Sequence, residues 1–135
     1  MSSTVITKPK VNIDPALLDE IQAQIHEAGQ VVIHFLYYTP PAEYSSYIRI
    51  WPTTFLYDKG SAHSSELVHV ENITYYPQWH ECVAGSANFF TLIFSGLPRS
   101  CTSFDFIEHC TNQSGAFAVY DIARSESDVY FIRIS

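Results

Sequence analysis

Hydrophobic and polar residues alternate in short runs along most of the chain, and this pattern predicts β-strands. From Val31 onward the runs are rich in aromatic and β-branched residues, and Gly, Pro, Ser and Asp residues separate them. The expected strands are Val31–Tyr38, Tyr47–Trp51, Thr54–Tyr57, Leu67–Glu71, Phe89–Ser95, Phe104–Ile107, Phe117–Ile122 and Val129–Ile134. In the second of these, the isoleucines at 48 and 50 share one face, and Tyr47, Arg49 and Trp51 share the other.

Many short strands between turns predict an all-β fold of seven to nine strands. Val31–Tyr38 is apolar on both faces, as in a strand inside a two-layer structure, so we expect a two-layer antiparallel β-sandwich of immunoglobulin-like type. The sequence contains no linker, low-complexity tract or repeat of fixed period. Residues 1–135 are therefore expected to form a single domain, with residues 1–13 as a flexible or extended N-terminal segment.

The segment from Asp14 to Gly29 fits two structures. Asp14 and Pro15 suit the start of a helix and Gly29 its end, and the leucines and isoleucines between them form one apolar stripe. Ile21–His26 also alternates with a period of two, as a strand does. These local signals favour the helix by a small margin.

Composition and charge exclude several classes of protein. Hydrophobic residues make up 47% of the 135 residues and charged residues 16%, which excludes a disordered chain. Seven Lys and Arg stand against fourteen Asp and Glu, giving a net charge of −7. Nucleic acids and anionic membranes bind clustered positive charge, so we expect neither as a partner. No apolar run is long enough for a membrane-spanning helix, so no membrane insertion is expected.

The N-terminal residues and the cysteines bear on location. No apolar run of a secretory signal follows Lys8 and Lys10, so we expect a cytoplasmic location, with an envelope location open if a leader precedes the chain. Cys82, Cys101 and Cys110 are too few, and odd in number, for a disulfide framework. We therefore expect reduced thiols.

His80, Cys82, His109 and Cys110 are the residues best suited to metal or thiol chemistry. Imidazole and thiolate are ordinary zinc ligands, and a tetrahedral site needs four ligands that converge. His80 and Cys82 share a face if that segment is extended, whereas His109 and Cys110 are neighbours and point apart. Because no paired ligand spacing is present, we expect no metal and no cofactor. A small metal- or thiol-dependent enzyme built on these four residues remains the alternative function.

Other catalytic arrangements are weaker. The chain contains no nucleophile elbow, phosphate-binding Gly-rich loop or zinc-protease helix motif. Asp105 and Glu108 are the nearest approach to paired carboxylates, and we expect them to face solvent beside a Phe-rich strand. His34, inside an apolar strand, is expected to be a hydrogen-bonded structural residue. We therefore expect that the protein is not an enzyme.

Two segments rich in Tyr and Pro, residues 38–47 and 75–80, give the best indication of function. If both lie at one end of the fold, their side chains form a surface that recognises a sugar or a protein partner. The candidate ligand-binding residues are Tyr44, Tyr47, Tyr75, Tyr76, Trp79 and His80. The opposing interpretation is that these aromatic side chains cover the open ends of the sandwich.

The sequence thus favours a non-catalytic binding or assembly module that uses aromatic loops or edge strands for recognition. A protein or carbohydrate partner fits the aromatic segments, and unpaired edge strands allow a homodimer or the addition of a partner strand. A third hypothesis is a purely structural homo-oligomer subunit without a small ligand.

An ordered series of strand sequences resembles a known domain. The series is Val31–Phe35, Tyr47–Ile50, Phe90–Phe94 with Gly96-Leu97-Pro98, Ser103–Glu108, Gly115–Phe117 and Asp128–Tyr130. Over residues 20–134 it resembles the β-sandwich domain that precedes thioredoxin-like domains in some bacterial envelope proteins. The resemblance implies a strand at Ile21–His26 paired with Val31–Tyr38, in place of the helix. It implies no reaction, and with neither a Cys-x-x-Cys pair nor a thioredoxin-like domain, no redox activity carries over.

Overall fold

The computed structural model describes residues 3–6, 29–41, 44–111 and 116–134, and these residues form strands, turns and loops without a helix. No helix in these ranges is therefore available to cross a membrane. The strands are β1 (Ser3–Ile6), β2 (Val31–Tyr38), β3 (Ser46–Ile48), β4 (Thr54–Asp58), β5 (Ser64–Glu71), β6 (His80–Cys82), β7 (Ala87–Phe94), β8 (Ser103–Glu108), β9 (Ala118–Ala123) and β10 (Val129–Ile134). The all-β expectation is thus confirmed for the described part of the chain.

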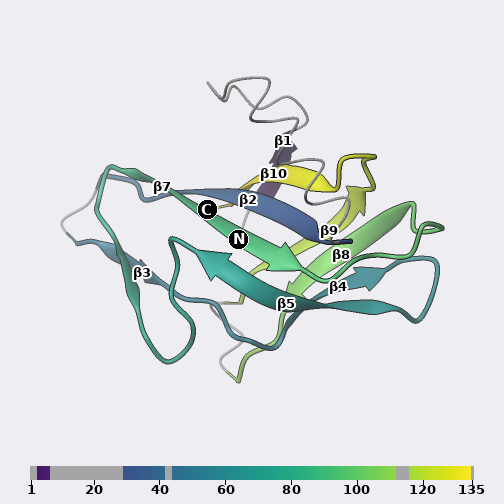
Figure 1. Ribbon diagram of the computed structural model, residues 1–135. Helices are drawn as coiled ribbons and strands as arrows, with labels where there is room; N and C mark the ends of the chain where they lie inside the picture. The colour runs from purple at the N-terminus through teal and green to yellow at the C-terminus, as the bar shows by residue number, and fades with distance from the viewer. Residues whose placement is uncertain (1–2, 7–28, 42–43, 112–115, 135) are drawn as a thin grey trace.

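Eight of these strands form one continuous sheet in the order β1-β10-β2-β7-β5-β4-β8-β9. All neighbours in it are antiparallel except β10 and β2, which run parallel from the pair Val129 and Val32 to the pair Ile134 and Tyr37. The sheet curls into a half-barrel (Figure 1). The remaining strands, β3 and β6, pair with each other as a separate antiparallel ribbon.

The expected two-layer antiparallel sandwich of immunoglobulin-like type is not confirmed. A sandwich divides its strands between two sheets, whereas here hydrogen bonds connect eight strands into a single curled sheet that contains one parallel pair. The physical reason is that inward and outward side chains alternate in the same way in both architectures. The pattern therefore predicts strands and their faces, but it does not predict which strands pair.

The hydrophobic core fills the concave side of the curled sheet. Phe35 of β2 lies 5.1 Å from Phe106 of β8 between ring centroids, and Phe104 of β8 lies 5.0 Å from Tyr130 of β10 in an edge-on contact. These partners come from strands that are not neighbours in the sheet, so the curl brings their aromatic side chains together. Phe90 stacks on Phe35 at 5.0 Å and extends the same cluster to β7.

The convex side of the sheet carries His34, which was expected to be a structural residue. Its Nδ1 lies 2.7 Å from the Oγ1 of Thr91, directly opposite on β7, and its ring lies 5.0 Å from that of Phe131. Burial lowers the pKa of His34, because the charged imidazolium loses hydration there. The prediction of a hydrogen-bonded structural histidine is confirmed.

All eight strands predicted from the pattern are present, with ends that differ by a few residues. Two further strands, β1 and β6, were not predicted as strands; β1 falls within the expected N-terminal segment and β6 within an expected loop. The helix or strand expected between Asp14 and Gly29 lies outside the described residues, apart from Gly29 itself. Both edges of β2 are hydrogen-bonded, one to β10 and the other to β7.

The core arrangement predicts a large effect of Phe106→Ala. Phe106 is 1% exposed and contacts both Phe35 and Phe94, so we expect the variant to lose about 3–5 kcal/mol of unfolding free energy in urea denaturation. The matched control is Phe89→Ala, because Phe89 is 67% exposed and should change stability by about 0.5 kcal/mol or less. Equal losses in the two variants would contradict the described core.

Candidate functional site

The β3–β6 ribbon joins the two aromatic segments. Tyr47 lies opposite Glu81, and Ile48 lies opposite His80. Beyond the ribbon, Ile50 forms an isolated parallel bridge with Tyr75: its N–H donates to the carbonyl of Thr74 at 2.9 Å, and its carbonyl accepts from the N–H of Tyr76 at 2.8 Å. Residues 44–51 and 75–82, which are far apart in the sequence, therefore lie side by side.

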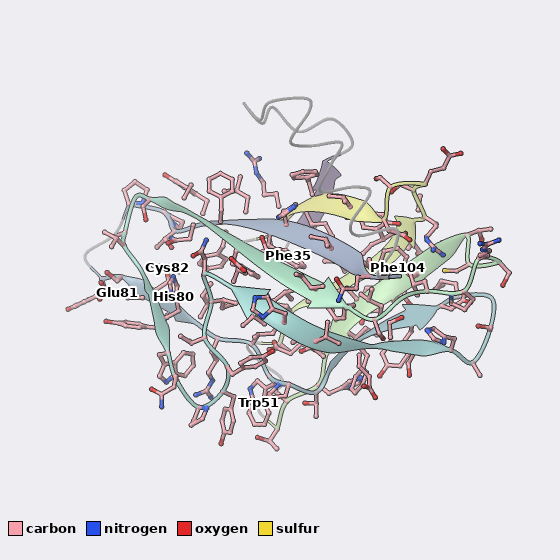
Figure 2. All side chains as sticks on the ribbon, viewed as in Figure 1. Phe35, Trp51, His80, Glu81, Cys82 and Phe104 are labelled. Atoms are coloured by element: carbon pink, nitrogen blue, oxygen red, sulfur yellow. The ribbon has the colours of Figure 1, made fainter. Side chains whose placement is uncertain are left out.

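Alternation along the ribbon separates a core face from a solvent face. Ile48, Ile50 and Cys82 are 0–5% exposed and belong to the hydrophobic core cluster. Tyr47 and Trp79 lie on the other face and are 56% and 57% exposed. Figure 2 labels His80, Glu81 and Cys82 beside β3, at the opposite end of the molecule from Phe104. The core face anchors the ribbon, which leaves the aromatic face free to contact solvent or a ligand.

Four planar groups on this face stack in sequence, and we call them the aromatic ladder: Trp51, Tyr76, Arg49 and Trp79. The rings of Trp51 and Tyr76 are 3.8 Å apart at an interplanar angle of 23°. The guanidinium carbon of Arg49 lies 4.6 Å from the centre of the Tyr76 ring and 3.7 Å from that of Trp79. Arg49 also donates from Nη1 to the carbonyl oxygen of Pro77 at 3.2 Å. The cation thus makes cation–π contacts with two aromatic side chains.

A polar pair lies beside the ladder. The hydroxyl of Tyr47 donates to Oε2 of Glu81 at 3.2 Å across the ribbon. Among the described residues, no donor reaches the other carboxylate oxygen, Oε1. Glu81 pairs with Tyr47 in the ribbon, and Arg49, two positions after Tyr47, lies over Trp79, so Glu81 and Trp79 lie on the same face.

The six predicted ligand-binding residues are only partly brought together. Tyr47, Tyr76 and Trp79 contribute to the aromatic face, whereas His80 is half-buried on the opposite face of β6. Tyr75 is 37% exposed and forms the bridge to Ile50. Tyr44, just before β3, has the most exposed aromatic side chain in the described residues, at 76%.

Sequence reasoning missed three contributors to this face: Arg49, Trp51 and Glu81. The signal for the first two was present, since alternation already assigned Arg49 and Trp51 to the face of Tyr47. No local pattern predicted that Trp79 would lie against Arg49, because that contact depends on the register of β3 against β6.

The expectation that Glu108 faces solvent is wrong, because its side chain faces the core. It is 5% exposed at the end of β8, on the same side as Phe104 and Phe106. Its Oε2 accepts from the backbone N–H of Trp51 at 2.9 Å, and its Oε1 accepts from that of Phe117 at 3.0 Å. Burial raises its pKa above the ordinary value of 4.5, although these two hydrogen bonds and the charge of Arg49 oppose the rise.

Asp105, the other expected solvent-facing carboxylate, is half-buried on the opposite face of β8. Lys59 pairs with it at 3.4 Å, and its Oδ1 accepts from the backbone N–H of Asp121 at 2.8 Å. Asp105 and Glu108 therefore point to opposite sides of the sheet and do not form a carboxylate pair.

The four residues of the metal or thiol alternative are not gathered into one cluster. In the described residues, which include all four, no group of three or more His, Cys, Asp and Glu side chains is placed to hold a metal ion. Burial, together with the charge of Glu81, raises the pKa of the Cys82 thiol, which disfavours the reactive thiolate. His109 instead contacts the hydroxyl of Tyr57 through Nε2 at 2.6 Å.

A contact between a serine and a histidine elsewhere in the sheet is structural. Nε2 of His63 lies 3.0 Å from the hydroxyl of Ser65, which donates to the carbonyl oxygen of Gly96. Ser65 is fully buried, so no substrate can reach its oxygen as a nucleophile.

Comparison of the chain with protein-family models, curated proteins and solved structures finds no match. The resemblance to the envelope-protein domain therefore stays a prediction, and the interpretation of the site depends on its own geometry.

The ladder predicts a specific effect of replacing Arg49. We expect Arg49→Ala to weaken the near-UV circular dichroism of the stacked rings and to lower the unfolding free energy by about 1 kcal/mol, because two cation–π contacts are lost. Arg49→Lys keeps the charge but lacks the planar group, so it should restore only part of the signal. An unchanged near-UV spectrum in Arg49→Ala would show that the cation does not order these rings.

The burial of Glu108 predicts a dependence of stability on pH. Between pH 4.5 and its raised pKa, the carboxyl is ionised in the unfolded chain but protonated in the fold, so this group lowers the unfolding free energy as pH rises through that window. Glu108→Gln removes the contribution. The unfolding free energy of the wild type minus that of the variant should therefore fall as pH rises above 4.5, then level off. Urea denaturation over a pH series measures it, and a difference that increases with pH would contradict the assignment.

Proposed function

We propose that this protein is a non-catalytic binding module whose recognition surface is the aromatic face of the β3–β6 ribbon. The observation that carries the proposal is the aromatic ladder, in which Arg49 fixes the exposed ring of Trp79 on a base anchored in the core. Apolar ring surface in contact with water lowers the stability of the folded protein. An exposed aromatic surface that is kept despite this cost is typical of an interaction site.

The rigidity of the ladder supports recognition over a covering role. Tyr and Trp provide a large contact area with few rotatable bonds, and a side chain that is already ordered loses little entropy when a ligand binds. Trp79 is held by stacking on Arg49, and Tyr47 by its bond to Glu81, before any ligand arrives. If these side chains covered the end of the core, we would expect them to be buried, yet each is more than half exposed.

Recognition through an edge strand is the other route suggested by the sequence, and the edge formed by β9 is poorly suited to it. The pairing of β9 with β8 shifts register between Phe104 and Phe106, and Asp121 there has a left-handed backbone with φ of 56°. Lys59 forms ion pairs with both Asp105 and Asp121 at this irregularity. Bulges and charges of this kind protect edge strands from pairing with other chains.

The proposal predicts that binding depends on Trp79 while folding does not. Wild-type protein would be applied to an array of immobilised oligosaccharides and an array of peptides, and every positive spot would be retested with Trp79→Ala. We expect binding to at least one probe to fall by about tenfold or more in the variant, because truncating an aromatic anchor of a binding surface costs about 2 kcal/mol or more. The melting temperature should fall by only a few degrees, since Trp79 is 57% exposed and loses one cation–π contact.

The matched control is Tyr120→Ala, which removes a similarly exposed aromatic side chain from β9. It should leave binding intact. Two outcomes would overturn the proposal: binding that is equally strong in Trp79→Ala, or an unfolded Trp79→Ala protein, which would show that the side chain serves the core.

A further inference from the structure

The position of Arg49 limits the charge of any ligand of the aromatic face. Exposed Trp and Tyr rings attract cations to their faces, and a ligand with a free ammonium group would otherwise be the natural occupant. Here Arg49 already lies over the rings of both Tyr76 and Trp79. Arg49 also donates to Pro77, which holds its positive charge beside both rings, and this charge disfavours a second cation on the same rings.

Negative charge disfavours anionic ligands at the same place. Glu81 lies beside Trp79 on the aromatic face, and its only hydrogen-bond donor among the described residues is the neutral hydroxyl of Tyr47. The whole chain carries a net charge of −7, which repels phosphates and carboxylates at long range. The ligand that fits these constraints is neutral, has an apolar surface for Trp79, and has donors for Glu81.

A sugar ring combines these features. The C–H groups on one side of a pyranose form an apolar face that stacks on an indole, and hydroxyl groups at its rim donate to carboxylates. Arg49 lies over one face of Trp79, and the residue is still 57% exposed, so ring surface remains for a ligand. Trp79 and Glu81 lie on the same face of the ribbon, so one sugar ring with its hydroxyls can contact both.

We infer that the aromatic face binds a neutral glycan, with one pyranose stacked on Trp79 and its hydroxyls donating to Oε1 of Glu81, which no donor reaches in the described part of the chain. This inference rests on the proposed function and names its ligand class. Tyr47 positions the carboxylate by donating to Oε2, so that Oε1 is directed to the sugar. The role of Glu81 distinguishes a sugar from a purely apolar partner, which would stack on the ring without needing a carboxylate.

The test uses soluble neutral polysaccharides of defined composition, namely β-glucan, mannan and xylan, with the anionic polymers alginate and polygalacturonate for comparison. Affinity electrophoresis of the full chain in gels that contain each polymer reports binding as retarded migration. We expect at least one neutral polymer to retard the wild type and neither anionic polymer to do so. Trp79→Ala and Glu81→Gln should each weaken the retardation by about tenfold or more, because each removes a stacking contact or a charge-assisted hydrogen bond.

Control variants separate the site from general effects. Glu66→Gln removes the same charge from an exposed position on β5, and Tyr120→Ala removes an exposed tyrosine from β9; both should bind as the wild type does. Circular dichroism of every variant shows that it folds. If Glu81→Gln fails to fold, Glu81→Asp, which withdraws the carboxylate by one methylene group, replaces it. A Trp79→Ala protein that fails to fold would overturn both the glycan and the binding module.

The outcomes distinguish this inference from the function on which it rests. Trp79-dependent binding of a peptide, with no retardation by any neutral polymer, would overturn the glycan and leave the binding module in place. Retardation by neutral polymers that is insensitive to Glu81→Gln would overturn the assigned role of the carboxylate. If no probe binds in a way that depends on Trp79, both the inference and the proposed function fail.

Discussion

Contact between aromatic side chains across the concave side of the sheet is the interaction on which the rest of the structure depends. Phe35 meets Phe106, and Phe104 meets Tyr130, although their strands are separated in the sheet by other strands. A flat sheet would leave these rings in water, so burying them requires the curl. The same cluster includes Ile48 and Ile50, which attach the β3–β6 ribbon to the core and leave its aromatic face outside.

Glu108 connects this core to the aromatic ladder. A buried carboxylate is costly unless donors satisfy it, and here the donors are the backbone N–H groups of Trp51 and Phe117. The carboxylate thereby fixes the backbone where the ladder begins, and the charge of Arg49 favours its ionised form. A polar group in the core thus helps to position an apolar surface outside it, and the stability of the fold and the order of the ladder are coupled through one residue.

The sequence predicts individual strands well and their assembly poorly. Alternation identified the faces of residues 47–51, because each side chain faces the core or solvent according to its own position. The same rule, applied along β8, would have placed Glu108 with Phe106 in the core and Asp105 outside, so that error was avoidable. The parallel pairing of β10 with β2 and the meeting of Arg49 with Trp79 depend on long-range register, which no local pattern contains.

The placement of Arg49 is notable because the chain has few positively charged residues. With seven Lys and Arg against fourteen Asp and Glu, cations are scarce, and this one lies between two aromatic rings when acidic partners are available elsewhere. Stacking places its charge against the rings of Tyr76 and Trp79, and this charge disfavours a second cation there. The ligand that we propose follows from this: it covers the exposed part of Trp79 and supplies donors to Glu81, and it carries no charge.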